Sequence, residues 1–278
     1  MSLEDIKRKF GKLVEEGNNS GLADFEGYSP AEMHQIMYLT FNPGNPIQLQ
    51  RLEDNDYNQI PMLNQIKYLA NLIEKAGEIK LTNKGFLPTR IVAELYQQRF
   101  ITDISIELKL RKLYKETDAI SINLTRILLE LSGLVKKRNG KLSLTAAGRK
   151  TLSDNHALLH LILTTFTKKF NWAYYDIFNN QKTAQLGYGF TLILLSKYGD
   201  EKRLDSFYAE KYFRAFPMLK DFDDYPVRCY SVRSFKRFLN YFGLISIESS
   251  DPFIQTVKYI TKTDIFDKLI KVTPPKSA

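Results

Sequence analysis

One segment near the middle of the chain constrains the fold more than any other. Residues 121–132 have the apolar spacing of a helix, and Gly133 is placed to end it. Two short runs typical of β-strands follow, 134–138 and 141–145, and Asn139-Gly140 joins them. Asn-Gly between two such runs is the strongest two-residue signal for a β-hairpin. The sequence therefore predicts a helix followed by an antiparallel hairpin in which 134–138 pairs with 141–145.

The same order recurs before and after this segment. Helices that end at Gly77 and Gly243 are each followed by a short strand, and the last segment has a second strand at 257–260. Each unit leads to a threonine placed to cap a new helix, namely Thr82, Thr145 and Thr261. The chain is therefore predicted to carry three related units, of which the first lacks a visible second strand.

Two resemblances follow from these motifs. Residues 121–152, centred on LTRILLELSGLVKKRNGKLSLTAAGRKTL, resemble the recognition helix, wing and following helix of winged-helix repressors of the multiple-antibiotic-resistance type. The wider chain resembles a group of uncharacterised bacterial proteins through SPAEMHQIMY, IKLTNKGFLPTRIVAELY, FNWAYYD and RSFKRFLNYFGLI. The first resemblance implies a fold, and the second implies no activity.

These patterns predict a mainly α chain with short β-hairpin wings. An N-terminal helical segment is expected over 1–60, where Ser29-Pro30-Ala31-Glu32 forms a capping box. Two winged-helix-like units, the first degenerate, are expected over 61–152. A helical section followed by the third unit is expected over 153–278. The stretch 47–58 is expected to be irregular, and the tail from Val272 is expected to be frayed.

Composition narrows the compartment and the partners. Forty Lys and Arg against 31 Asp and Glu give a formal net charge of +9, which favours polyanionic partners. Cys229 is the single cysteine, so no disulfide framework can form within one chain, which fits a reducing compartment. The first residues carry acids and no apolar run of a signal peptide, and no apolar stretch is long enough to span a bilayer. We therefore expect a cytoplasmic protein without a membrane partner.

The helix of the third unit is the leading candidate for nucleic-acid binding. On a 100° helical wheel its apolar side chains share one arc, namely Val232, Phe235, Phe238, Leu239 and Phe242. Polar side chains without an acid share the opposite face, namely Arg233, Lys236, Arg237 and Asn240. In a helix-turn-helix such a face lies in the major groove, where Arg and Lys reach guanine edges and phosphates. The competing interpretation is a solvated basic face on a packed helix.

The hairpin of the second unit is the second candidate. Its basic side chains are placed to touch backbone phosphates, namely Lys136, Lys137, Arg138 and Lys141. The helix before it is expected to expose Asn123, Arg126 and Glu130, and an acid there repels a nucleic-acid backbone. A hydrated, solubilising hairpin is the alternative interpretation.

The remaining clusters favour structure over chemistry. Eight aromatic residues between Phe166 and Phe190 could stack on a single strand, but their helical spacing favours core packing or a subunit contact. His156 and His160 lie four apart on a predicted helix, and no third zinc ligand accompanies them in a recognised motif. No nucleophile elbow, phosphate-binding glycine loop or dinucleotide fingerprint is present. We therefore predict no catalytic residues, no metal and no cofactor.

The function that these features favour is non-enzymatic binding of nucleic acid, with double-stranded DNA as the expected partner. The alternative is a protein-interaction module whose winged-helix units pack against a protein partner or form a homo-oligomer. The basic faces support the first, and the aromatic segment supports the second.

Overall fold

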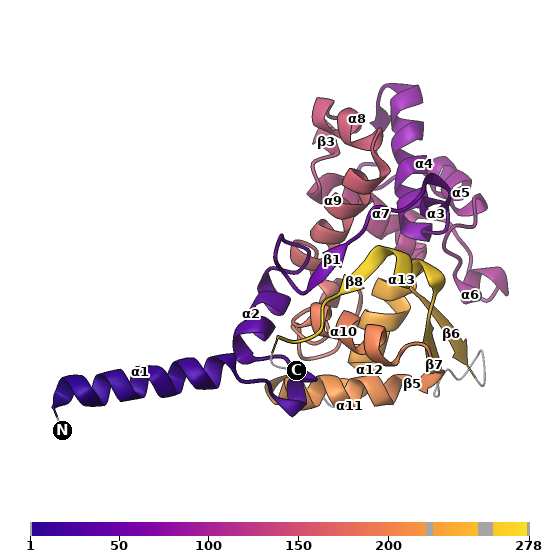
Figure 1. The fold of residues 1–278 in the computed structure, drawn as a ribbon. Coiled ribbons are helices and arrows are strands. Elements are labelled where there is room, and N and C mark those ends of the chain that lie inside the picture. Colours follow the sequence, from indigo (N-terminus) through magenta and orange to yellow (C-terminus); the bar gives the residue numbers. More distant parts are fainter. Residues whose placement is uncertain (1, 221–224, 250–257, 277–278) are drawn as a thin grey trace. The chain divides into compact units, whose positions relative to one another are not determined.

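The computed structural model describes residues 2–220, 225–249 and 258–276. The described chain is mainly helical, with small antiparallel sheets (Figure 1). It divides into two compact units. Unit 1 comprises Met1–Gln50, Ile177–Arg237 and Ile245–Ala278, and unit 2 comprises Arg51–Asp176 and Phe238–Leu244. This division differs from the three predicted ranges, since Met1–Gln50 belongs to the same unit as Ile245–Ala278.

Unit 2 contains the helices that the sequence predicts over residues 61–152. Its elements are α3 (Asp54–Tyr57), α4 (Pro61–Ala76), β2 (Ile79–Lys80), α5 (Thr89–Gln97), α6 (Ile104–Glu107), η2 (Glu116–Asp118), α7 (Ile120–Leu131), β3 (Val135–Arg138), β4 (Lys141–Leu144), α8 (Ala146–Leu152), α9 (Asn155–Lys168) and η3 (Trp172–Tyr175).

The predicted hairpin in unit 2 is confirmed. β3 and β4 pair antiparallel over their whole lengths. Asn139 and Gly140 have φ values of 50° and 69°, the left-handed conformations that a two-residue hairpin turn requires. Thr145 caps α8 as expected, because its Oγ1 accepts a hydrogen bond from the backbone nitrogen of Gly148 at 2.8 Å.

β2 adds a third strand to this hairpin. It pairs antiparallel with β4, which gives the sheet order β2-β4-β3. The first two predicted units therefore share one sheet. Thr82 does not cap a helix: its Oγ1 accepts a hydrogen bond from the backbone nitrogen of Phe86 at 3.1 Å within a turn, and α5 begins only at Thr89.

Aromatic side chains fill part of the core of unit 2. Phe166, Phe170 and Trp172 are all buried. The ring of Phe166 lies 5.0 Å from that of Trp172 and 5.6 Å from that of Phe238, centroid to centroid. The prediction that this segment packs in the core is confirmed for these residues, whereas Tyr174 is 62% exposed.

Unit 1 is assembled from three stretches of the chain. Its elements are α1 (Leu3–Asn19), η1 (Ala23–Phe25), α2 (Pro30–Tyr38), β1 (Ile47–Leu49), α10 (Tyr188–Tyr198), β5 (Arg203–Leu204), α11 (Asp205–Ala215), η4 (Pro217–Leu219), α12 (Pro226–Tyr230), most of the π-helix η5 (Ser231–Leu239), β6 (Ile245–Ser249), β7 (Lys258–Lys262), α13 (Asp264–Leu269) and β8 (Ile270–Val272).

The element order of unit 2 returns in unit 1. In unit 1 the order is α10, β5, α11, the helical run α12–η5, β6 and β7. The corresponding order in unit 2 is α4, β2, α5, α7, β3 and β4. The second sheet has the order β5-β7-β6, which matches β2-β4-β3 position by position. The helix after β7 is capped by Thr263, whose side chain accepts a hydrogen bond from the backbone nitrogen of Phe266. Thr261, the predicted cap, lies within β7, and Val257 lies outside the described residues.

A sheet that the sequence did not predict joins distant parts of the chain. β1 pairs antiparallel with β8, and Figure 1 shows these strands side by side. The backbone nitrogen of Thr273 also donates to the carbonyl oxygen of Pro46 at 2.8 Å. The expectations of an irregular 47–58 stretch and of a frayed tail from Val272 are therefore wrong for these residues, because each segment supplies the other's backbone partners.

The predicted capping box at the start of α2 is confirmed, with Ser29 and Glu32 bonded reciprocally. Glu26, just before α2, forms hydrogen bonds with residues of α10 and α11. Its carboxylate accepts hydrogen bonds from Lys197 Nζ at 2.7 Å, Lys211 Nζ at 2.7 Å and Tyr198 Oη at 2.6 Å. Burial alone would raise the pKa of Glu26, but these donors outweigh burial and hold it below its ordinary value of 4.5.

A Glu26→Gln variant should therefore be less stable than the wild type at neutral pH, by about 1.5 kcal/mol. Because the folded-state pKa of Glu26 is lowered, its contribution is fully present above pH 4.5 and is lost as the pH falls through the folded-state value. Urea unfolding of both proteins at a series of pH values should show the difference shrinking below pH 4.5. A constant difference across that range would contradict the assignment.

Candidate nucleic-acid interface

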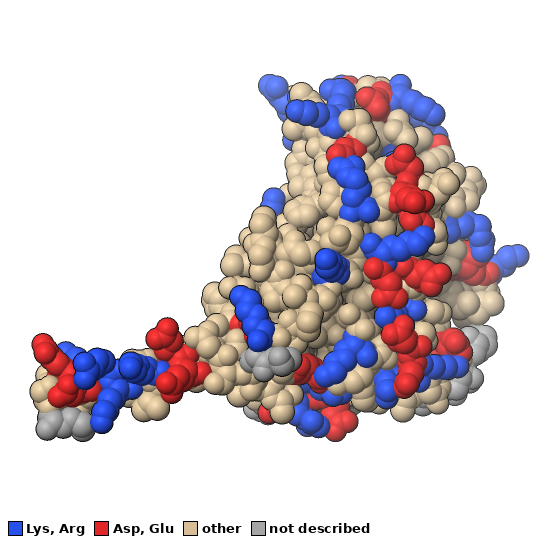
Figure 2. Space-filling view, in the orientation of Figure 1, with Lys and Arg blue, Asp and Glu red and all other residues tan. Residues whose placement is uncertain are grey.

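The strand register of the sheet in unit 2 places basic side chains in a row. Lys80 pairs with Lys141, which in turn pairs with Arg138, so one cation from each strand lies on the same face. Lys136 pairs with Ser143 on that face as well. We call Lys80, Lys136, Arg138 and Lys141 the basic sheet face. All four side chains are exposed, and Figure 2 shows Lys and Arg gathered over the region where Figure 1 labels β3 and α8.

Alternation along the strands explains why these residues face outward. The apolar residues that alternate with them are almost fully buried, namely Ile79, Val135, Leu142 and Leu144, whereas Lys137 between Lys136 and Arg138 is exposed. Lys137 falls in register with Leu142 and therefore on the opposite side of the sheet from the basic sheet face. Its ammonium lies next to Gly85, in the turn that follows β2. Three of the four predicted wing residues thus share one face, and Lys137 does not.

The basic sheet face is incompletely neutralised. Lys141 forms an exposed ion pair with Glu78. Within the described ranges, no carboxylate pairs with Lys80, Lys136 or Arg138. Each pair of like charges directly opposite one another on a sheet lowers the stability of the fold by about 0.2–1 kcal/mol. A bound polyanion would relieve that repulsion.

The matching positions in the sheet of unit 1 carry no such row. Leu204, Tyr259 and Glu248 stand where unit 2 has Lys80, Lys141 and Arg138. Lys202 forms an ion pair with Glu248, and its ammonium lies 5.0 Å from the centre of the Tyr259 ring. The two sheets therefore share a topology and differ in charge.

The helix predicted to lead in DNA binding is only partly available. Lys236 and Asn240 are exposed and Arg237 is half-buried. Arg233, which was expected to face solvent, is fully buried. Its Nη1 donates to the carbonyl oxygens of Asn180 at 2.7 Å and Thr183 at 3.1 Å. The expected exposure of Arg233 is therefore wrong.

Helix geometry explains this error. Residues 231–239 form a π-helix, whose hydrogen bonds span five residues and widen each turn. A wheel drawn at 100° per residue consequently misplaces side chains around the axis. The apolar positions Phe235, Phe238, Leu239 and Phe242 are buried as predicted, and Val232 is only half-buried.

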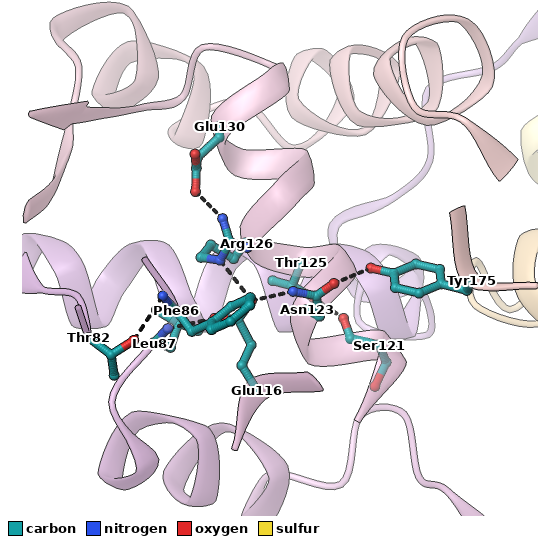
Figure 3. A network of polar contacts seen from close by, with 10 residues as sticks. All are labelled: Thr82, Phe86, Leu87, Glu116, Ser121, Asn123, Thr125, Arg126, Glu130 and Tyr175. Atoms are coloured by element: carbon teal, nitrogen blue, oxygen red, sulfur yellow. Dashed lines mark hydrogen bonds and ion pairs between the residues drawn. The ribbon is translucent and has the colours of Figure 1, made fainter. Parts of the chain in front are cut away.

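The helix α7, which precedes the hairpin, is covered rather than exposed. Asn123 and Arg126 are buried and Glu130 is half-buried, so the expectation that all three face solvent is wrong. Figure 3 shows the cause, a network centred on Glu116, whose side chain is fully buried. Its carboxylate accepts hydrogen bonds from the Leu87 backbone nitrogen at 2.6 Å, from Arg126 Nε at 2.7 Å and from Asn123 Nδ2.

Two further residues extend this network. Tyr175 donates from its hydroxyl to Asn123 Oδ1 at 2.6 Å, and burial raises the pKa of that hydroxyl well above its ordinary value. Arg126 Nη1 donates to Glu130. Asn123 and Arg126 on α7 therefore make their hydrogen bonds inside unit 2 and are not available to contact a groove of DNA.

The comparisons with known proteins are limited to one family. A family model described as the Y4jL N-terminal domain matches residues 58–157. That range contains α4 to β4 and therefore the whole of the basic sheet face. Comparison with curated proteins and comparison with solved structures give no match.

Two structural searches bear on other classes of site. Among the residues that the structure describes, no group of three or more His, Cys, Asp or Glu side chains could hold a metal ion. No helix in the described part of the chain is long and apolar enough to cross a membrane.

Proposed function

We propose that the chain carries two winged-helix units, one in each compact unit. Support comes from the repeated order helix, strand, helix, helix, hairpin and from the shared strand order in the two sheets. In this arrangement β3 and β4 are the wing of the first unit, and β6 and β7 are the wing of the second. The resemblance of residues 121–152 to winged-helix repressors agrees with this assignment.

We propose that the protein binds double-stranded nucleic acid, with DNA as the expected partner, through the basic sheet face. The observation that carries this proposal is the row Lys80–Lys141–Arg138, which the register aligns across three strands. Phosphates along a duplex backbone are regularly spaced anions, and a row of exposed cations on a rigid sheet suits them. Lys236, Arg237 and Asn240 are proposed as additional contacts because they remain at least partly exposed.

This mode of binding should depend little on base sequence. The helix α7 would read bases in a winged-helix complex, but its polar side chains Asn123 and Arg126 are engaged with Glu116. Contacts to phosphate position a protein on a duplex without reading its sequence. We therefore propose backbone binding rather than recognition of a specific site.

The test is duplex binding by a variant that lacks the basic sheet face. Lys80, Lys136, Arg138 and Lys141 are each replaced by Gln, and affinity for a labelled duplex is measured at several salt concentrations. Affinity should fall at least about tenfold, and the slope of log K against log salt should fall by about 0.9 for each phosphate that the variant no longer neutralises.

A charge-matched control separates this face from net charge. The control replaces four exposed lysines elsewhere, namely Lys112, Lys182, Lys220 and Lys271, with Gln. Its affinity and salt slope should stay close to those of the wild type. Equal losses in both variants would mean that net charge alone drives binding, and no duplex binding by the wild type at low salt would refute the proposal.

The rival function, a protein-interaction module, is favoured by a different surface. Between α5 and α7, large apolar side chains are exposed: Ile104 and Leu108 to 44%, Tyr114 to 62% and Leu110 to 71%. Apolar side chains gathered in one exposed segment are typical of a protein contact. A partner retained after nuclease treatment, and released by Leu110→Asp with Tyr114→Asp, would support this rival.

A further inference from the structure

The first helix, α1, has an apolar stripe whose side chains are all exposed among the residues that the structure describes. Leu3, Ile6, Phe10 and Leu13 follow one another at spacings of three and four residues, the pattern of a helix-pairing seam. Their exposures are 69%, 46%, 67% and 66%, and no residue of α1 is buried. Figure 1 shows α1 as a separate helix at the N-terminal end.

The charges of α1 are separated along its axis. The bases lie in its middle part, namely Lys7, Arg8, Lys9 and Lys12. Glu15 and Glu16 lie in its last part, after two acids in the first turn. Figure 2 shows both signs on this helix. When a second copy runs in the opposite direction, its Glu15 and Glu16 can face the bases from Lys7 to Lys9.

We propose that α1 pairs with α1 of a second copy of this chain, antiparallel, and so forms a homodimer. In the register that the charges favour, Phe10 faces Leu13 of the second copy and Leu13 faces its Phe10, whereas Ile6 lies opposite Gly17 and Leu3 opposite Ser20 at the ends of the pair. Lys9 then lies beside Glu16 of the second copy, and the two-fold axis of the pair places Glu16 beside its Lys9 in the same way. A shift by one heptad would instead bring the two Lys9 side chains together, which opposes that alternative.

The charge balance distinguishes a second copy from a membrane surface. α1 carries four acids and four bases, so its net charge is zero. Helices that lie on anionic membranes carry an excess of Lys and Arg on the polar face. The two-fold symmetry of an antiparallel pair, by contrast, uses both signs equally.

The interface is short, which sets its expected strength. A helix of 17 residues is about 25 Å long, so it offers one apolar stripe only a few turns in length. Interfaces of this size lie at the weak end of specific association. The dimer should therefore dissociate on dilution.

Sedimentation velocity of the full chain, without nucleic acid, tests the proposal over about a hundredfold range of concentration. Wild-type protein should pass from monomer to dimer across this range. Phe10→Glu with Leu13→Glu should raise the dissociation constant at least about tenfold. The matched control, Arg8→Gln with Lys12→Gln, shifts net charge by the same amount on the opposite face and should dimerise like the wild type.

The same experiment defines the results that overturn the proposal. A wild type that stays monomeric throughout, or a double variant that dimerises as well as the wild type, would refute it. Circular dichroism should show that the variants unfold at the same temperature as the wild type, because no residue of α1 is buried. A monomer that binds anionic vesicles through Phe10 and Leu13 would assign the stripe to a membrane surface instead.

A distance measurement tests the orientation. A spin label on Asn19→Cys reports the separation of the two helix ends, since the native Cys229 is buried. An antiparallel pair should hold the two labels more than about 20 Å apart along the axis, whereas a parallel pair would bring them together. A short distance would refute the antiparallel arrangement. Neither experiment involves nucleic acid, so both outcomes are independent of the proposed function.

Discussion

Replacing Glu116 with Ala should lower the free energy of unfolding by about 3–5 kcal/mol, because it removes one of the two carboxylates that pair with the buried Arg126 and the acceptor of two further buried donors. The Arg126 side chain is only 10% exposed, and Glu116 Oε1 accepts its Nε hydrogen bond at 2.7 Å. The same carboxylate also accepts from the backbone nitrogen of Leu87, which would lose its acceptor in a buried position. Chemical denaturation measures the destabilisation, and amide exchange at Leu87 should accelerate.

Glu130→Ala is the matched control for this prediction. Glu130 also accepts a hydrogen bond from Arg126, but its side chain is 26% exposed and it holds no backbone nitrogen in place. Its removal should cost no more than about 1 kcal/mol. If the two variants were equally stable, the network in Figure 3 would not be what holds α7 against its neighbours.

Local signals in the sequence predicted local structure well. The Asn139-Gly140 turn fixed the hairpin, because only residues that tolerate positive φ adopt such a turn. The capping box at Ser29 and the cap at Thr145 were recognised because each depends on residues three positions apart. All of these interactions lie within a few residues of the chain.

Pairing between distant segments could not be predicted in the same way. β2 joins β4 across some sixty residues, and no local pattern records that register. Lys80 was therefore missed as a candidate site residue, although its strand was recognised. The same limitation explains the sheet of β1 and β8, whose strands come from the two ends of the chain.

Burial of polar residues was the other failure. A helical wheel treats Asn123 and Arg126 as solvent-facing because it contains no information on their partners. Glu116 and Tyr175, which satisfy them, belong to other elements. A buried polar group is tolerated when it is hydrogen-bonded, so its exposure depends on residues that the wheel omits.

Arg233 is a further buried polar side chain, and its burial can be tested. Arg233→Ala should lower the free energy of unfolding by about 2–5 kcal/mol, because its side chain is fully buried and donates to two carbonyl oxygens. The variant leaves the carbonyl oxygens of Asn180 and Thr183 without this donor and opens a cavity beside the Phe178 ring, whose centre lies 5.8 Å from the guanidinium carbon. Denaturation of the full chain measures the effect.

Lys236→Ala provides the control, since Lys236 lies on the same π-helix and is exposed. Its removal should change stability by no more than about 0.5 kcal/mol. The contrast also separates folding from binding: a variant that removes Arg233 together with Lys236 and Arg237 would lose duplex affinity by unfolding part of unit 1, whatever those side chains contact. Equal stability of Arg233→Ala and Lys236→Ala would contradict the buried placement and restore Arg233 as a candidate contact to DNA.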